Sequence, residues 1–155
     1  MPKTALPPLV YERDDPRAAR LRALIAERAL LRGDFTLASG RKSDILFQLR
    51  NITLLPEGQF LIGSLIAEFM RRARLTCAGG LEMGAVPIVS AIAFASHVQG
   101  SPVDVFFVRK AAKDHGAKEL INGYLPKGAD VLAIDDVTTT GGSTLKAIDE
   151  PSGSW

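Results

Sequence analysis

Residues 131–149, VLAIDDVTTTGGSTLKAID, decide the fold that the sequence predicts. An apolar run of strand length, from Val131 to Ile134, leads into two adjacent carboxylates, and a loop of threonines and glycines follows before helical periodicity begins. An apolar run without alternation is typical of a strand buried on both faces of a parallel sheet. The order strand, loop, helix therefore indicates an α/β fold that binds ligands beyond the carboxyl ends of its strands.

The loop after this strand has the chemistry of a phosphate cradle. Residues 138–144, TTTGGST, offer backbone N–H groups, hydroxyls, and glycines that let a ligand approach the main chain. Asp135 and Asp136 would repel a phosphate placed directly against them, so a neutral or cationic group must lie between. A ribose satisfies this requirement, because its hydroxyls can donate to the carboxylates while its 5-phosphate lies in the loop. A Mg²⁺ ion that bridges hydroxyls and a pyrophosphate would serve as well. An acidic pair by itself is more often a plain strand end, but the whole pattern favours a phosphoribose site.

The rest of the chain fits the same fold class. Apolar residues recur at helical spacing, and short apolar runs lie between turn signals. The sequence predicts a central, mainly parallel sheet flanked by helices, preceded by an N-terminal helix and a hairpin. The expected helices cover residues 16–31, 56–72 and 87–97, the hairpin lies within 34–55, the strands cover 75–78, 103–108 and 131–134, and 79–86 is a turn-rich connection.

Composition sets limits on partners and setting. The 155 residues are 46% hydrophobic, the size of one domain with a real core, and the net charge of +2 does not indicate a nucleic-acid surface. The longest apolar run, residues 84–95, is too short to span a bilayer. The single cysteine, Cys77, excludes an internal disulfide and any CxxC metal site, so a reducing cytoplasm is expected. No nucleic-acid or membrane partner is predicted.

A basic cluster follows the apolar run at 103–108. Arg109, Lys110, Lys113 and His115 lie within seven residues and are opposed only by Asp114. A solvated surface loop is one interpretation. The other is a group of cations that closes over a departing pyrophosphate and stabilises its growing negative charge.

At these stretches the sequence resembles the type I phosphoribosyltransferases, and among them the orotate phosphoribosyltransferase family. Residues 131–144 resemble the family's PRPP-binding motif, residues 106–125, FFVRKAAKDHGAKELINGYL, resemble its mobile catalytic loop, and residues 33–43, GDFTLASGRKS, resemble its N-terminal hairpin. The resemblance extends over about residues 31–148. It implies the transfer of phosphoribose from PRPP to orotate, giving orotidine 5-phosphate and pyrophosphate in UMP biosynthesis, with Mg²⁺ bound mainly through PRPP.

The resemblance also implies roles for individual residues. Lys113 is expected to reach into the partner subunit's site, which makes a homodimer the working unit. The implied catalytic residues are Lys113, His115, Asp135 and Asp136; the implied PRPP or pyrophosphate contacts are Arg109, Lys110, Lys113, His115, Glu82, Met83, Gly84, Asp135, Asp136, Val137, Thr138, Thr139, Thr140, Gly141, Gly142 and Ser143; the implied orotate contacts are Leu46, Phe47 and Thr139.

The sequence departs from the family's pattern at several positions. Ala38 and Met83 stand where some members carry a lysine, and Lys42 is close enough to compensate for the absence of a lysine at position 38.

Residues 1–15 are expected to form a loose arm, residues 16–150 an incomplete phosphoribosyltransferase domain without its C-terminal strands, and residues 151–155 a non-native-looking tail. Three alternatives stay open: a transferase for a purine or another base, a non-catalytic PRPP-binding regulator, and an inactive truncated paralogue.

Overall fold

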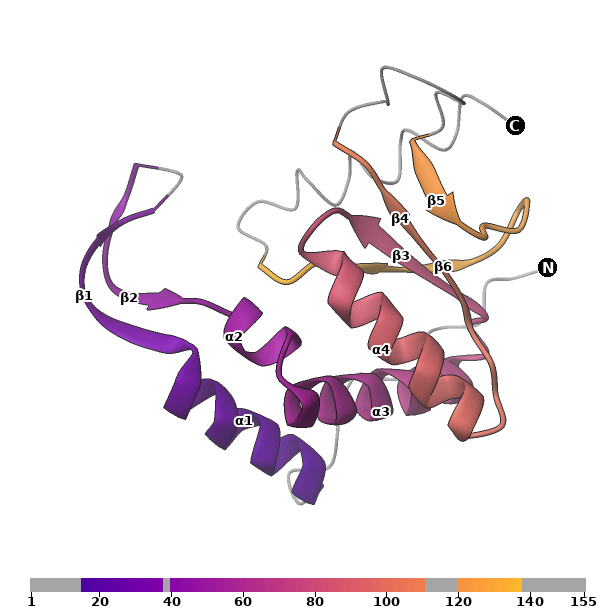
Figure 1. Cartoon of the computed structure of the whole chain (residues 1–155), viewed down its shortest axis with the longest axis horizontal. Helices are drawn as coiled ribbons and strands as arrows, with labels where there is room; N and C mark the ends of the chain where they lie inside the picture. Colours follow the sequence, from indigo (N-terminus) through magenta and orange to yellow (C-terminus); the bar gives the residue numbers. More distant parts are fainter. Residues whose placement is uncertain (1–14, 38–39, 111–119, 138–155) are drawn as a thin grey trace.

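The computed structural model describes residues 15–37, 40–110 and 120–137 (Figure 1). Helices and strands alternate along most of this part of the chain. In order they are α1 (Pro16–Arg28), β1 (Leu30–Thr36), β2 (Lys42–Phe47), α2 (Arg50–Thr53), α3 (Pro56–Ala73), β3 (Cys77–Leu81), α4 (Ala85–Val98), β4 (Asp104–Val108), β5 (Ile121–Gly123) and β6 (Val131–Ile134).

The strands form two sheets. One is the antiparallel hairpin of β1 and β2, and the other is four-stranded with the order β5-β4-β3-β6. In the larger sheet β4, β3 and β6 are parallel, whereas β5 pairs antiparallel with β4. The predicted α/β fold with a mainly parallel sheet, an N-terminal helix and a hairpin is therefore confirmed. The hairpin was expected within residues 34–55, but it begins earlier, at residue 30, and ends at residue 47.

Helices α3 and α4 cover one face of the four-stranded sheet. Met70 of α3 and Ile92 of α4 are fully buried in one cluster with Ala78 of β3 and Ile134 of β6. Burying such side chains is the main driving force for docking these helices on the sheet. In Figure 1 the hairpin extends away from this sheet, and α2 lies between the hairpin and α3.

The central strand β3 begins two residues and ends three residues later than the predicted strand at 75–78, and it runs through two glycines. These glycines suggested a turn, but both are buried within the sheet. A Cβ added to Gly79 would lie 2.3 Å from the ring of Phe106, and one added to Gly80 would lie 1.9 Å from the carbonyl oxygen of Ile134. The glycines are required because neighbouring groups occupy the space of a side chain.

The first helix is shorter than predicted. It ends at Arg28 instead of residue 31, and Ala29 forms its cap. Leu30 and Leu31 pair with Phe47 and Leu46 across the hairpin. Strand pairing, which is not visible in the helical spacing of the leucines, therefore overrides local helix propensity here.

Other differences concern short elements. Helix α4 begins two residues before the predicted start, at Ala85, and β4 begins one residue late, at Asp104. Helix α2 and strand β5 were not predicted, because four and three residues are too few to show a period. Among the described helices, none has the length and apolar character required to cross a bilayer.

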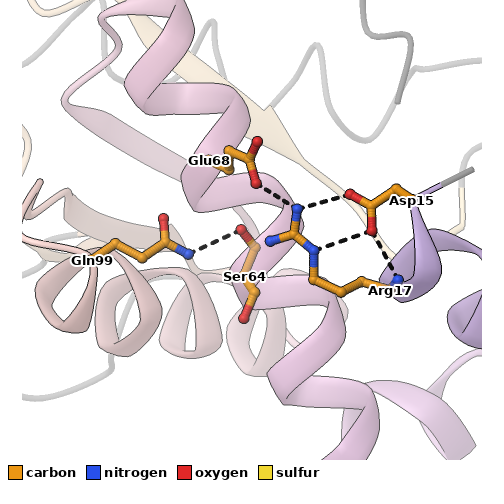
Figure 2. A network of polar contacts seen from close by, with 5 residues as sticks. All are labelled: Asp15, Arg17, Ser64, Glu68 and Gln99. Carbon is orange, nitrogen blue, oxygen red and sulfur yellow. Dashed lines mark hydrogen bonds and ion pairs between the residues drawn. The ribbon is translucent and has the colours of Figure 1, made fainter. Parts of the chain in front are cut away.

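A polar network holds α1 against α3 (Figure 2). The carboxylate of Asp15 accepts the backbone N–H of Arg17 at 2.8 Å and caps α1, and the Arg17 guanidinium contacts both Asp15 and Glu68 of α3. Hydrogen bonds from Arg17 lower the pKa of Asp15 from 3.8 to about 2. Nearby, the Gln99 amide donates to the carbonyl of Ser64 at 3.2 Å and so links the end of α4 to α3.

Candidate functional site

Three of the predicted site segments lie at one edge of the sheet. Because β3, β4 and β6 are parallel, their carboxyl ends meet there. Residues 82–84 follow β3, residues 109–110 follow β4, and residues 135–137 follow β6. The structure thus brings together segments that are about 25 residues apart in the chain.

The carboxylate of Asp136 is held by its surroundings. Its Oδ1 accepts the backbone N–H of Val137 at 2.9 Å, and its Oδ2 lies 4.0 Å from Nε of Arg50. It packs so closely against Gly84 that an added Cβ would lie 2.3 Å from Oδ1. The carboxylate of Asp135 accepts the N–H of the next residue, Asp136, at 2.9 Å. Asp136 is therefore packed against the segment that follows β3.

The segments after β3 and β4 are joined directly. Glu82 donates its backbone N–H to the carbonyl of Val108 at 2.8 Å, and its carboxylate accepts the N–H of Lys110 at 3.0 Å. Met83 is 65% exposed, so its side chain is available to a ligand. Nε of Arg109 is buried and has no hydrogen-bond partner. Such an unpaired buried donor is costly.

Two of the residues expected to contact orotate, Leu46 and Phe47, lie on the hairpin. Leu46 and Phe47 are the last two residues of β2, and Phe47 is 46% exposed. Lys42 donates to Oγ1 of Thr36 at 2.9 Å across the hairpin. Helix α2 follows the hairpin in the chain, and the side chain of its first residue, Arg50, lies beside Asp136 at the carboxyl ends of the parallel strands.

Several predicted residues lie outside the described ranges: Ala38, Lys113, His115, Thr138, Thr139, Thr140, Gly141, Gly142 and Ser143. The arm at 1–14 and the tail at 151–155 do so as well. Their roles stay predictions.

Arg50 is a cation at this edge that the sequence did not single out. It stands between the apolar residues Leu49 and Ile52, next to Asn51, without a motif around it. No local signal could have identified it, because its partner Asp136 is 86 residues away.

The donors available for a metal ion are carboxylate oxygens. Across residues 15–37, 40–110 and 120–137, no cluster of three or more His, Cys, Asp and Glu side chains converges. Asp135 and Asp136 do present hard oxygen ligands at the strand ends. Mg²⁺ commonly takes one or two carboxylates and completes its shell with substrate phosphates and water. The acidic pair therefore fits an ion that is bound mainly through a diphosphate ligand.

This arrangement defines the class: an α/β protein in which an acidic pair and two basic residues meet at the carboxyl ends of its parallel strands. No protein-family model matches the chain. Individual known proteins, however, are similar to it in sequence. The chain is 48% identical over 136 residues to orotate phosphoribosyltransferase of Bradyrhizobium diazoefficiens, covering 84% of this chain and 72% of that protein. It is 40% identical over 134 residues to the enzyme of the same name from Sorangium cellulosum, covering 84% and 70%.

Solved structures agree. Orotate phosphoribosyltransferase of Mycobacterium tuberculosis, in complex with Fe(III) dicitrate, superposes with a TM-score of 0.73 at 40% identity and covers 86% of this chain and 75% of its own. The same enzyme in complex with PRPP gives a TM-score of 0.70 at 35% identity, covering 88% and 75%. The chain belongs to the orotate phosphoribosyltransferase family. The resemblance seen in the sequence is confirmed, and so is the assignment to the pentosyl-transferring enzymes.

Proposed function

We propose that this chain transfers phosphoribose from PRPP to orotate, giving orotidine 5-phosphate and pyrophosphate for UMP synthesis. The observation that carries the proposal is the meeting of three segments at one sheet edge: the acidic pair, the segment 82–84, and the cations Arg109 and Lys110. The relatives' names supply the substrate. Family membership favours this activity over transfer to a purine or another base.

The acidic pair would bind the ribose. Asp135 and Asp136 accept hydrogen bonds from its hydroxyls, and their charge stabilises the positive character that the ring gains as the bond from C1 to pyrophosphate breaks. The electron pair of that bond leaves with pyrophosphate. A ring nitrogen of orotate forms the new bond to C1 and releases its proton to water, so the step needs no covalent enzyme intermediate.

The basic residues would receive the leaving group. Arg109 and the exposed Lys110 directly follow β4, and the backbone N–H of Lys110 donates to the carboxylate of Glu82 in the segment 82–84, where a diphosphate would rest. Lys113 and His115 are proposed to extend this cluster, and residues 138–143 to hold the 5-phosphate. Mg²⁺, held by PRPP and the acidic pair, would supply further positive charge against the diphosphate. Leu46, Phe47 and Thr139 are proposed as orotate contacts.

The test removes the charge of the acidic pair. Replacing both Asp135 and Asp136 by Asn should abolish turnover, because the ribose loses its acceptors and the transition state its nearby anions. Loss of orotate absorbance with PRPP and Mg²⁺ measures activity, and urea denaturation checks that the fold is retained. The control is Arg72→Gln, an exposed residue at the far end of α3. Turnover by the double variant would refute the proposal. If the unaltered chain binds PRPP without turnover, the alternatives of a regulator or inactive paralogue hold instead.

We also propose that the working unit is a homodimer in which Lys113 serves the partner's site, and that the protein works in the cytoplasm. The family resemblance supports the first. The second is supported by the cysteine content: Cys77 is the single cysteine of the sequence, so no internal disulfide can form, as is typical of proteins in a reducing compartment. Sedimentation equilibrium measures the oligomeric state, and a monomer at assay concentration would contradict the homodimer. Fractionation of the source cells tests the cytoplasmic location.

A further inference from the structure

Arg50 is fixed in place by the short helix that it begins. Ile52 of α2 is 1% exposed and lies in a core cluster with Leu24 and Leu61. The Asn51 amide donates to the carbonyl of Arg28 at 3.1 Å. The backbone of α2 is therefore anchored to α1 and α3, while the side chain of Arg50 is 75% exposed. A rigid backbone thus presents a cation to the sheet edge.

The partner of Arg50 is the more buried member of the pair. The Asp136 side chain is 17% exposed, and its Oδ1 is already engaged by the N–H of Val137. Nε of Arg50 approaches the other oxygen, Oδ2, at 4.0 Å. Gly84 closes off the side next to Oδ1. Arg50 is thus a cationic neighbour of the oxygen that remains for a ribose hydroxyl.

The charge of Arg50 is suited to this position beside the acidic pair. Two adjacent carboxylates stand at a site where a highly anionic ligand is proposed to bind, and their field opposes its approach. A guanidinium beside Asp136 reduces that opposition. Because Arg50 is largely exposed, the ion pair adds little to stability in the free protein. The ion pair is expected to matter when PRPP is bound, because the ligand displaces water around both side chains.

We propose that Arg50 is a positioning residue of the phosphoribosyl site: it orients the Asp136 carboxylate toward the ribose and offsets the negative charge that PRPP meets. The inference rests on the proposed function. It also ties the two halves of the site together, since Arg50 follows Phe47 by three residues and so connects the hairpin that faces the base to the carboxylate that faces the sugar.

The geometry favours arginine over lysine at this position. A planar guanidinium can direct one N–H to the carboxylate while its other N–H groups face the ligand, whereas an ammonium acts as a point charge. Lysine should therefore restore the charge but only part of the orientation.

The experiment compares Arg50→Gln and Arg50→Lys in the full chain. The matched control is Arg22→Gln, because Arg22 is exposed on α1 and far along the chain from the site. Titration calorimetry with PRPP and Mg²⁺ gives the dissociation constant. Arg50→Gln should weaken PRPP binding by about tenfold, which is the lower end of the loss in affinity expected on removing a group that orients a ligand-binding side chain. Arg50→Lys should recover only part of the loss, and the control should bind like the unaltered chain. Urea midpoints of all variants should agree.

Kinetics and a double variant separate positioning from direct contact. The Michaelis constant for PRPP should rise in Arg50→Gln while that for orotate stays unchanged. In a background of Asp136→Asn, the same substitution should have little further effect, because both changes remove one interaction. An undiminished effect in that background would overturn the inference, as would a rise confined to orotate, or PRPP binding equal to the control. Failure of the unaltered chain to bind PRPP would overturn the proposed function along with it.

Discussion

Replacing Gly84 by Ala should damage the site without damaging the fold. The backbone of Gly84 is right-handed helical, with φ of −59° and ψ of −43°, a conformation that alanine adopts freely. The added methyl, however, would lie 2.3 Å from Oδ1 of Asp136, where an ordinary contact begins at 3.4 Å. The carboxylate must therefore retreat by about 1 Å, or the segment after β3 must move by a similar amount.

The expected effect of Gly84→Ala is a lower kcat/KM. A misplacement of about 1 Å in a reacting site can cost about 100-fold, and in kcat/KM this equals about 2.8 kcal/mol of transition-state stabilisation. Stability should change by less than about 1 kcal/mol, because alanine restricts the unfolded chain and so offsets a small loss at the helix start. The assay follows orotate absorbance with PRPP and Mg²⁺, beside urea denaturation.

The control is Gly100→Ala, which should show the opposite pattern. Gly100 has φ of +71° after the end of α4, and no atom lies within 4 Å of an added Cβ. Alanine there is strained by about 1–2 kcal/mol in the left-handed conformation, but it touches nothing at the site. A Gly84→Ala variant that keeps kcat/KM within about threefold of the unaltered chain would refute the placement of Asp136 at the ribose.

Two further predictions concern ionisable groups away from the site. In Asp15→Asn the helix cap is retained but the attraction to Arg17 is lost, so the variant should be less stable at neutral pH. Since the folded-state pKa of Asp15 is about 2 and its ordinary value is 3.8, the stabilisation is complete above 3.8 and is lost as the pH falls toward 2. The difference in urea midpoint between the two proteins should therefore shrink below pH 4; a constant difference would contradict this. Cys77 is fully buried with a pKa raised to about 11, chiefly by burial, so a thiol reagent at pH 8 should react with it only after unfolding. Rapid labelling of the native protein would contradict this.

The parts of the fold that the sequence predicted are those whose signal is local. The apolar run Val131–Ile134 is observed as β6 with the same bounds, and α3 begins at Pro56 as expected. The parts that it missed depend on distant partners. Gly79 and Gly80 suggested a turn because their neighbours Phe106 and Ile134 are far away in the sequence.

The same distinction applies to the site. The acidic pair was found because its strand, its carboxylates and the residues after them are contiguous. Arg50 was not found, since its importance comes from the fold that places α2 beside the end of β6. The contact of Gly84 with Asp136 joins two separately predicted segments, and only the pairing of β3 with β6 brings them together.

The assembly of the site from three strand ends has a thermodynamic consequence. The unfolded chain cannot hold these segments together, so a ligand that spans them binds the folded state alone. Such a ligand raises the free energy of unfolding by linkage, by about 2.7 kcal/mol at a concentration one hundred times its dissociation constant. The melting temperature should then climb with PRPP concentration even when no orotate is present. For this chain, PRPP would stabilise the carboxyl ends of the sheet as well as act as a reactant.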